Sequence, residues 1–526
     1  MMRRSLTRRQ FVLGMAGAGL LTAAPWIWTS RKSAYAQAYT SRAFIGAEGY
    51  GAQTKGWRDP SCQILLVTNL NDSGPGSFRQ AYQNTTGPRI ILFQVAGYIP
   101  VVTELSNAAA GAGYCYVAGQ SAPGDGITFK GQSAGTNNGA LYLRQGQTCV
   151  RYIRNRGTKA DGTNNWNISF WGLGSLGNYI IDHCSLSYAT DDANANAADY
   201  VTFQWSIIAD TISDGHAVLS DHHAGGKYLS YHHNYFVSCL QRTPLFSDSN
   251  GESINNLNYN WGGFQGLGAE FFNVFTTSPI PNYDVISNYF KWGPASGFGN
   301  LAGWDDPQWG KEIVHGYAPG NLYLSDNKAL LPSPYGFTAA RTQVQGGGSL
   351  TLVGSKLNSP IIPVTVTSIA SQASADAFAT DLLSKVGCTR PNRDDNDAVN
   401  VAAYTNFTGY SNPIDETGHL YAQTHGGNAF CTLATGSSDI LSPSGMSDEF
   451  ITRMGLSNTT VASLSTSISQ SRGLGEDFMN IEWFLMEKAG DIAPLDGSGG
   501  GSIFAPRNRR SIGVPGMKFD GRRYGW

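Results

Sequence analysis

Short apolar segments, each with a small polar residue at its centre, recur along the middle of the chain. The segments cover residues 181–187, 203–208, 232–237, 258–263 and 286–291. Their central polar residues are Ser185, Ser206, Asn234, Asn260 and Asn288, which are separated by 21, 28, 26 and 28 residues. A repeat of this length, with one short strand and several turns, is typical of a solenoid. The pattern predicts an all-β fold, a right-handed parallel β-helix, whose stacked coils align these side chains into a hydrogen-bonded ladder.

Asparagine inside strands favours this fold over an antiparallel sandwich, which is the main alternative. Asn is normally disfavoured in strands, and a ladder between coils gives each Asn a hydrogen-bond partner. Further short strands are predicted upstream, bounded by Gly, Pro and Asn turns. They cover residues 64–70, 90–97, 115–120, 127–131, 140–145 and 149–156. We therefore expect the β-helix to occupy residues 39–349.

The pattern changes after residue 349. Helical periodicity marks residues 373–387 and 476–490. Because an open β-helix end exposes unpaired strand edges, we expect residues 350–495 to form a partly helical region that packs on the β-helix or caps it. Residues 496–526 are rich in Gly and Ser and then basic, which is typical of a solvated tail.

The first 38 residues have the pattern of an export signal. A twin-arginine motif begins at Thr7, an apolar stretch follows as far as Trp28, and an A-x-A cleavage site ends at Ala38. A transmembrane anchor is the alternative, but the apolar stretch is rich in Gly and Ala and ends in small residues. We expect a protein exported by the twin-arginine route, periplasmic or secreted, with no membrane contact after signal removal.

Composition narrows the class of function. The chain has 64 glycines, 14% charged residues and 12% aromatic residues, which suits a β-protein with a carbohydrate-handling surface. The signal carries six positive charges and no acidic residue, so its removal takes the formal net charge from −2 to −8. This balance argues against a nucleic-acid partner, which normally requires a basic face. Seven cysteines without a C-x-x-C pair argue against a zinc or redox site.

Residues 180–246 contain the candidate chemistry. Asp182 interrupts an apolar strand, where an unpaired carboxylate would be costly. Asp191 and Asp192 follow in a predicted turn, where they either offer oxygens to one ion or are simply solvated. Calcium takes roughly six to eight oxygen ligands and is the natural ion for a carboxylate site, with magnesium as the alternative. Arg242 either meets an acidic substrate or forms an ion pair with a neighbouring carboxylate.

Other polar residues lie in the same region. His216 and Lys227 are candidates for substrate binding in the coil between the acidic motif and Arg242. Arg154 and Arg156 share a strand face, so they either line the same groove or form salt bridges between coils. We favour the salt bridges.

Read together, these motifs resemble the pectate lyase family of polysaccharide lyases (family 1), in its bacterial secreted branch. The resemblance covers nearly the whole mature chain, with several long motifs in the family's order. They are AFIGAEGYGA (43–52), VTNLNDSGPGSFRQA (67–81), VAGQSAPGDGITFKG (117–131), VRYIRNR (150–156), IIDHCSLSYATDD (180–192), YHHNYFVSCLQRTPLF (231–246) and GLGEDFMNIEWFLM (473–486). The resemblance implies a calcium-dependent β-elimination that cleaves pectate (polygalacturonate) and leaves 4,5-unsaturated oligouronides.

The resemblance also implies roles for individual residues. Asp182 matches a calcium ligand of the family, Asp191 and Asp192 lie where further calcium carboxylates are expected, and Arg242 matches the arginine assigned to remove the C5 proton. That proton lies α to the C6 carboxylate and is acidified when the carboxylate is neutralised. Because arginine is very hard to deprotonate, Arg242 acts either as the base or as an electrostatic stabiliser, with another group such as hydroxide as the base.

Two other functions stay open on the same fold. A polygalacturonase-like hydrolase would use Asp carboxylates as acid and base, and the chain has Asp191-Asp192 and then Asp214-Gly215-His216 one coil later. The long lyase motifs count against it. A non-catalytic β-helical protein that binds acidic glycans is the second alternative. In every case we expect an acidic polysaccharide as the partner, and we expect a monomer.

Overall fold

The structure is a computed structural model that describes most of the chain between Arg42 and Leu495. The described residues are 42–131, 141–157, 167–170, 177–196, 198–211, 216–220, 228–239, 242–247, 250–261, 272–273, 282–294, 296, 313–317, 322–324, 330–332, 349–409, 441–456 and 478–495. The predicted export signal and the predicted basic tail both lie outside them. None of the helices described has both the length and the apolar character needed to cross a membrane.

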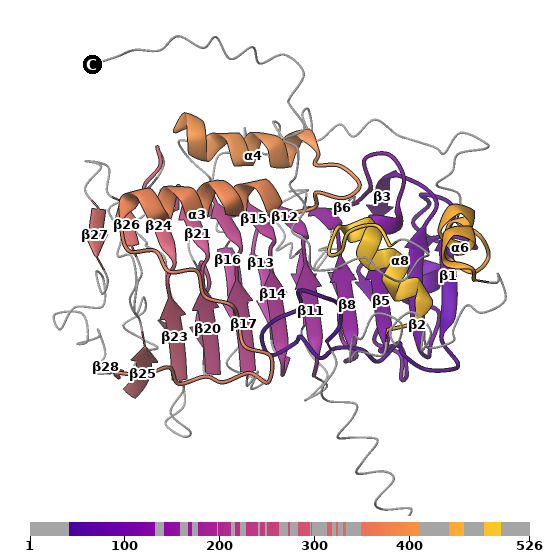
Figure 1. Ribbon diagram of the computed structural model, residues 1–526, viewed down its shortest axis with the longest axis horizontal. Helices are drawn as coiled ribbons and strands as arrows, with labels where there is room; N and C mark the ends of the chain where they lie inside the picture. The colour runs from indigo at the N-terminus through magenta and orange to yellow at the C-terminus, as the bar shows by residue number, and fades with distance from the viewer. Residues whose placement is uncertain are drawn as a thin grey trace, which may run out of the picture. The chain divides into compact units, whose positions relative to one another are not determined.

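The described strands form three long sheets (Figure 1), here called sheets A, C and D. Sheet A contains β1 (Gln63–Val67), β2 (Arg89–Phe93), β5 (Cys115–Ala118), β8 (Thr148–Arg151), β11 (Tyr179–Asp182), β14 (Val201–Gln204), β17 (Tyr228–His232), β20 (Asn250–Ile254), β23 (Asn282–Ile286), β25 (Ile313–Tyr317) and β28 (Ser349–Leu352). Sheet C contains β3 (Gly97–Val101), β6 (Ile127–Gly131), β9 (Ile153–Arg156), β12 (Ser185–Ser187), β15 (Ile207–Ala209), β18 (Tyr235–Val237), β21 (Leu257–Tyr259), β24 (Tyr289–Lys291), β26 (Leu322–Leu324) and β27 (Leu330–Pro332). Sheet D contains β4 (Leu105–Ser106), β7 (Leu141–Tyr142), β10 (Ile168–Ser169), β13 (Asp192–Asn196) and β16 (His216–Ser220), and β19 (Phe246–Ser247) pairs separately with β22 (Phe272–Asn273).

A full central coil contributes one strand to each sheet. β11, β12 and β13 form one coil, and β14, β15 and β16 repeat the same order in the next. Equivalent strands pair in parallel, as Tyr179 with Val201 in sheet A and Ser185 with Ile207 in sheet C. Only β26 and β27 pair antiparallel among the described strands. The architecture is therefore the parallel β-helix that the sequence repeat predicts.

A ladder of small polar side chains joins the coils at the turn between sheets A and C. Its members are Ser206, Asn234, Asn256 and Asn288. Each side-chain oxygen accepts the backbone N–H of the equivalent residue one coil earlier, over 2.8–3.0 Å. The predicted ladder is confirmed, but two of its predicted members are wrong. The parallel register gives Cys184 the place of Ser185 and Asn256 the place of Asn260.

The interior of the coils is apolar, and all three sheets contribute to it. In one coil, Ile181 of β11, Leu186 of β12 and Ala193 of β13 belong to the same buried cluster. The short helix α2 (Phe78–Tyr82) adds Phe78, whose ring centroid lies 4.7 Å from that of Phe129. Burial of apolar area is the main favourable contribution to folding, and strands of three or four residues suffice because each sheet supplies an inward side chain.

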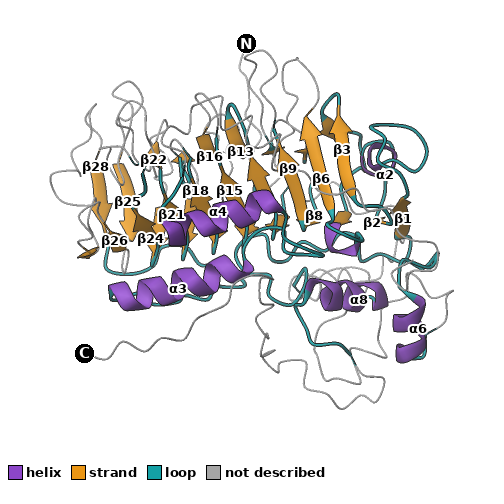
Figure 2. Ribbon diagram, turned by 90° about the horizontal axis from the view of Figure 1, so that it is seen from above, coloured by secondary structure: helices purple, strands orange, loops and turns teal. Residues whose placement is uncertain are grey.

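Helices follow the β-helix in the C-terminal region. Those described there are α3 (Gln372–Lys385), α4 (Asp395–Asn406), α6 (Asp448–Met454) and α8 (Asn480–Ala489). Figure 2 shows α3 and α4 along sheet C, and α6 and α8 near the first strands of sheet A. The helices predicted at 373–387 and 476–490 correspond to α3 and α8. This region packs on the β-helix, because side chains of α3 and α4 share a buried cluster with those of sheet C.

Buried charges also attach the C-terminal region to sheet C. Arg156 Nη2 lies 2.9 Å from Asp397 Oδ1 and 3.1 Å from Asp394 Oδ2. Arg154 Nη2 donates to the backbone oxygen of Cys388 at 3.1 Å. The predicted salt bridges between coils are therefore wrong, because both arginines bind the C-terminal region. Removing one partner of such a buried pair leaves an uncompensated charge, so the attachment belongs to the fold.

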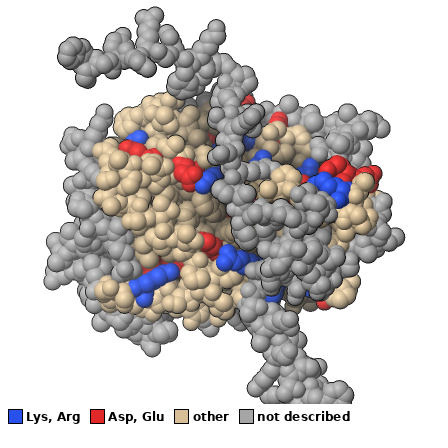
Figure 3. All heavy atoms as spheres, in the orientation of Figure 1, with Lys and Arg blue, Asp and Glu red and all other residues tan. Residues whose placement is uncertain are grey.

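Charged side chains are sparse on the described part of the face in Figure 3, where positive and negative groups lie next to each other. Two of the described ion pairs show such neighbouring charges. Lys385 Nζ lies 2.6 Å from Asp381 Oδ2 on α3, and Lys356 Nζ lies 2.8 Å from Glu252 Oε2 of β20. The described part of this face therefore carries charges of both signs, mixed with each other.

Candidate active site

Three successive coils bring four of the predicted site residues together at one end of sheet D. Asp191 and Asp192 stand at the start of β13, and His216, the first residue of β16, is the register partner of Asp192. His216 N donates to Asp191 O at 3.0 Å. Arg242 follows in the next coil, where its backbone oxygen accepts the N–H of Val218 at 2.8 Å. Backbone pairing between coils therefore sets the spacing of the site.

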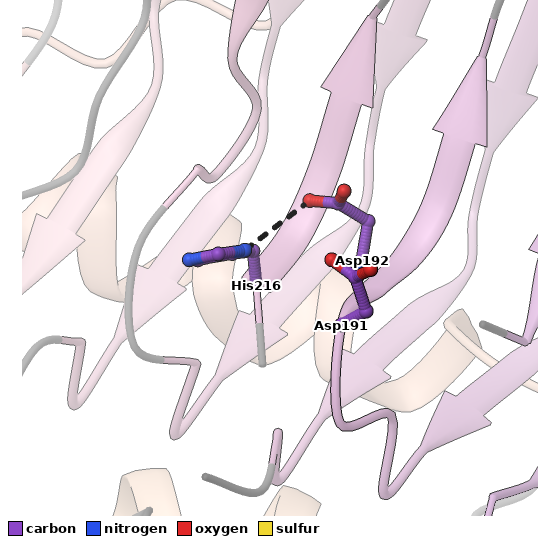
Figure 4. A group of neighbouring side chains, drawn as sticks. All are labelled: Asp191, Asp192 and His216. Atoms are coloured by element: carbon purple, nitrogen blue, oxygen red, sulfur yellow. Dashed lines mark hydrogen bonds and ion pairs between the residues drawn. The ribbon is translucent and has the colours of Figure 1, made fainter. Parts of the chain in front are cut away.

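Asp192 lies between the two basic side chains. Its Oδ1 atom is 2.9 Å from Arg242 Nη1 and 3.5 Å from His216 Nδ1. In Figure 4 the His216 ring presents one nitrogen to Asp192 and points the other away from it. The Asp192 side chain is 3% exposed, while those of His216 and Arg242 are 13% and 23% exposed. A buried carboxylate thus holds two side chains that solvent, and so a substrate, can reach.

The charge state of Asp192 follows from these contacts. Burial alone would raise its pKa, but the Arg242 guanidinium and the His216 ring more than offset this, so the pKa of Asp192 lies below its ordinary value. Asp192 is therefore ionised at neutral pH. In turn, an adjacent carboxylate favours the protonated form of a guanidinium. The backbone of Arg242 has φ of 62°, in the left-handed region.

Two carboxylates in this group fit a calcium ion. Asp191, Asp192 and His216 each offer one ligand atom, and these atoms lie within 4.8 Å of one another (Figure 4). Calcium takes oxygen ligands, roughly six to eight of them, whereas the His216 nitrogen suits transition metals better. Asp191 and Asp192 could therefore supply part of a calcium shell, whose other positions would be taken by water and substrate.

Asp182 lies apart from this group, at the end of β11 in sheet A, and its side chain is fully buried. Its Oδ2 atom is 2.7 Å from Arg151 Nε and 2.8 Å from His183 Nδ1, and its Oδ1 atom accepts from Gln204 Nε2 at 2.6 Å. Arg151 also pairs with Asp491, at 2.7 and 2.9 Å. Burial alone would raise the pKa of Asp182, but Arg151 and His183 hold it well below its usual range. We therefore propose a structural role for Asp182 in place of metal ligation.

Asp182→Asn tests that role. The substitution keeps the shape of the side chain but removes its charge, and hydrogen bonds to charged groups contribute roughly 1.5–3 kcal/mol. We expect the free energy of unfolding, measured with urea, to fall by about 2 kcal/mol. Calcium affinity measured by calorimetry should stay unchanged, whereas the control Asp191→Asn should weaken it. A metal ligand would show the reverse, with lost affinity at unchanged stability.

Comparison with known proteins identifies the family. No protein-family model matches the chain. The probable pectate lyase C of Neosartorya fischeri is 33% identical over 343 residues, covering 64% of this chain and 72% of that protein. The probable pectate lyase C of Aspergillus terreus is 32% identical over 334 residues, covering 62% and 70%. This chain belongs to the pectate lyase family. It is a polysaccharide lyase.

Other comparisons within the pectate lyase family are more distant. The structure of a thermostable pectate lyase aligns with a TM-score of 0.43 and 15% identity, over 67% of this chain and 98% of that one. A Bacillus pectate lyase in complex with trigalacturonate aligns with a TM-score of 0.38 and 16% identity, over 66% and 100%. The curated relatives above are fungal, so they give no support to the predicted bacterial branch.

The sequence does not predict two members of the charge network around Asp182, namely Arg151 and Asp491. A signal for Arg151 exists, because a buried carboxylate needs a cation and Arg151 is the register partner of Asp182 one coil earlier. Asp491 carried no such signal. Lys227 lies outside the described residues, so its role in substrate binding stays a prediction.

Proposed function

We propose that this polysaccharide lyase cleaves pectate, an acidic polymer of galacturonate, by calcium-dependent β-elimination and releases 4,5-unsaturated oligouronides. The supporting observation is the meeting of Asp191, Asp192, His216 and Arg242 from three successive coils. Carboxylates for a cation, beside a cationic side chain for an acidic substrate, are the parts that this reaction requires. Membership of the pectate lyase family makes this substrate class the natural one.

In this proposal Asp191 and Asp192 hold the calcium through their carboxylate oxygens. Bound there, calcium neutralises the uronate carboxylate and so makes the neighbouring C5 proton more acidic. His216 is assigned to the substrate instead, because the nitrogen that points away from Asp192 is available to a sugar hydroxyl or glycosidic oxygen. Asp192 orients His216 and Arg242 from between them.

The ion pair with Asp192 favours the second of the two roles that the sequence left open for Arg242. A guanidinium held 2.9 Å from a buried carboxylate resists deprotonation. We therefore assign Arg242 to stabilise the negative charge that develops on the uronate. Hydroxide takes the C5 proton. The freed electron pair forms the C4–C5 double bond as the glycosidic oxygen leaves C4 with its bonding electrons, and that oxygen is protonated by water.

Ultraviolet absorbance of the new double bond tests this proposal. When the mature protein meets polygalacturonate, absorbance should rise with calcium, fall to background with EDTA, and return with excess calcium. New reducing ends without absorbance would instead support the hydrolase. Binding of the polymer with neither signal would support the non-catalytic binding protein.

We also propose that residues 1–38 direct export by the twin-arginine route and that the mature protein is a monomer. Replacing Arg8 and Arg9 together by lysine should leave the protein in the cytoplasm of a bacterial host. Export of the double variant at the wild-type level would contradict the route.

Size-exclusion chromatography with light scattering checks the proposed monomeric state.

A further inference from the structure

Helix α4 packs beside the turns at which the chain leaves sheet C. The segments that carry the residues of the candidate site begin at these turns, which are here called corners. Four central coils leave sheet C through a residue in the left-handed region, with φ of 62° at Tyr188, 51° at Asp210, 52° at Ser238 and 57° at Asn260. These positions are equivalent, because each follows the last paired residue of β12, β15, β18 or β21. Residues other than glycine hold this conformation when their surroundings fix it.

Two of these corners lead directly to the site. Tyr188 precedes Asp191 by three residues, and Asp210 precedes His216 by six. Tyr188 N also donates to Asp210 O at 3.2 Å, which joins the two corners through the backbone. Residues 188–192 are described without a break. A shift of the Tyr188 corner therefore displaces Asp191 and Asp192, which follow within four residues.

Helix α4 holds both corners through buried side-chain hydrogen bonds. Tyr188 Oη donates to Asn396 Oδ1. Asn400 Nδ2 donates to Asp210 Oδ2 at 2.8 Å. Asn396 and Asn400 stand four residues apart, so they lie on one face of the helix. All four of these side chains are buried.

Helix α4 is itself bound to strands of sheet C. Asp397 Oδ1 lies 2.9 Å from Arg156 Nη2 of β9, and Tyr235 Oη of β18 donates to the backbone oxygen of Asn400 at 3.0 Å. These contacts bind α4 to strands on either side of the two corners. The helix therefore provides a rigid reference against which both loop roots are set.

We propose that α4 is a positioning element of the active site, in which Asn396 and Asn400 fix the roots of the loops that deliver Asp191, Asp192 and His216. This inference rests on the proposed function of that site. It assigns to the C-terminal region a part in catalysis besides covering the apolar outer side of sheet C. Small displacements of catalytic groups lower the rate of a reaction strongly, so the effect belongs in kcat.

Asn400→Ala in the mature protein tests the proposal. We expect kcat for polygalacturonate to fall about tenfold, with a smaller change in KM, at a temperature where the variant is fully folded. Asp210→Ala should give the same loss of kcat. The double variant should lose no more than either single variant, because both substitutions remove the same hydrogen bond. Asp210→Asn keeps an acceptor for Asn400 and should retain kcat. Asn406→Ala, at an exposed position of the same helix, is the matched control.

Amide hydrogen exchange provides a readout that needs no activity. Asn400→Ala should speed exchange in peptides covering residues 188–193 and 210–220, and Asn406→Ala should not. If the wild type fails to cleave polygalacturonate, the proposed function fails, while the exchange result still decides whether α4 holds the loops. A folded Asn400→Ala with wild-type kcat overturns the positioning role, and wild-type exchange overturns the contact on which it rests.

Discussion

Arg242→Ala is expected to lower kcat for polygalacturonate by about 10²–10³-fold, the usual effect of removing one group that stabilises charge in a transition state. Arg242 is the described cationic side chain that pairs with Asp192, at 2.9 Å, and it is 23% exposed. Its loss removes a positive charge from the place where the uronate becomes more negative. Initial rates of ultraviolet absorbance over a range of substrate concentrations separate the effect on kcat from that on KM.

Arg453→Ala is a matched control for this substitution. The Arg453 side chain is also 23% exposed, and it is ion-paired with Glu487 at 2.7 Å, but it belongs to α6. Its loss should leave kcat unchanged. A loss of less than tenfold in Arg242→Ala would count against a catalytic role for Arg242.

Arg242→Lys distinguishes the two roles of the arginine. A lysine keeps the positive charge but loses the planar fork of donors, so the variant should retain part of the activity. If hydroxide is the base, the rate of the variant should rise with pH in parallel with that of the wild type. If the side chain is itself the base, replacing it should move the alkaline part of the pH profile.

The sequence predicts the architecture well because every coil repeats the same pattern of apolar strand residues and small polar residues. Asn234 and Asn288 interrupt apolar strands, and such side chains need hydrogen-bond partners, which the adjacent coils supply. Spacing did not suffice to assign every member of the ladder, since the loops between coils vary in length. The register, and with it the place of Asn256 in the ladder, is set by the short turn between sheets A and C.

The same geometry explains which site residues could be grouped in advance. Asp191, Asp192, His216 and Arg242 occupy neighbouring places in three successive coils, so stacking brings them together. Asp182 precedes Asp191 by only nine residues, yet in that span the chain passes from sheet A through sheet C to sheet D. Closeness in sequence therefore misleads in a solenoid, where equivalent positions in adjacent coils are the true neighbours.

Contacts of the C-terminal region could not be predicted at all. Arg156 meets Asp397, and Asp210 meets Asn400. Asp397 and Asn400 belong to α4, a helix that the sequence pattern does not predict. Only docking of α4 on sheet C decides these pairs. The polar contacts that the sequence does not predict are therefore those between the β-helix and the C-terminal region.

Asp210→Asn should stabilise the protein above pH 7 by as much as about 4 kcal/mol, and the gain should disappear towards pH 4. Asp210 is buried, and burial raises the pKa of its carboxyl to about 7. The hydrogen bond from Asn400 and the charge of Arg156 lower this pKa, while Asp397 raises it. Asp210 Oδ1 has no hydrogen-bond partner within the described part of the chain, so ionisation at this position is poorly compensated.

The sign follows from the protons bound in each state. In the unfolded chain an aspartate ionises near pH 3.9, approximately, whereas folded Asp210 keeps its proton to about pH 7. Between these values the folded state binds more protons, so this residue lowers the free energy of unfolding as pH rises, and the loss is complete above pH 7. Asparagine does not titrate and still offers an oxygen to Asn400, so the variant lacks this fall in the free energy of unfolding with rising pH.

Urea denaturation of the wild type and of Asp210→Asn across this pH range isolates the effect, because every other titrating group is common to both proteins. Asp381→Asn is the control, since that side chain is 60% exposed on α3. The difference between Asp210→Asn and the wild type should grow from near zero at about pH 4 to its full value near pH 7. Parallel stability curves would mean that ionised Asp210 finds compensation on the folded protein. The contact with Asn400 would then hold α4 equally well at every pH tested.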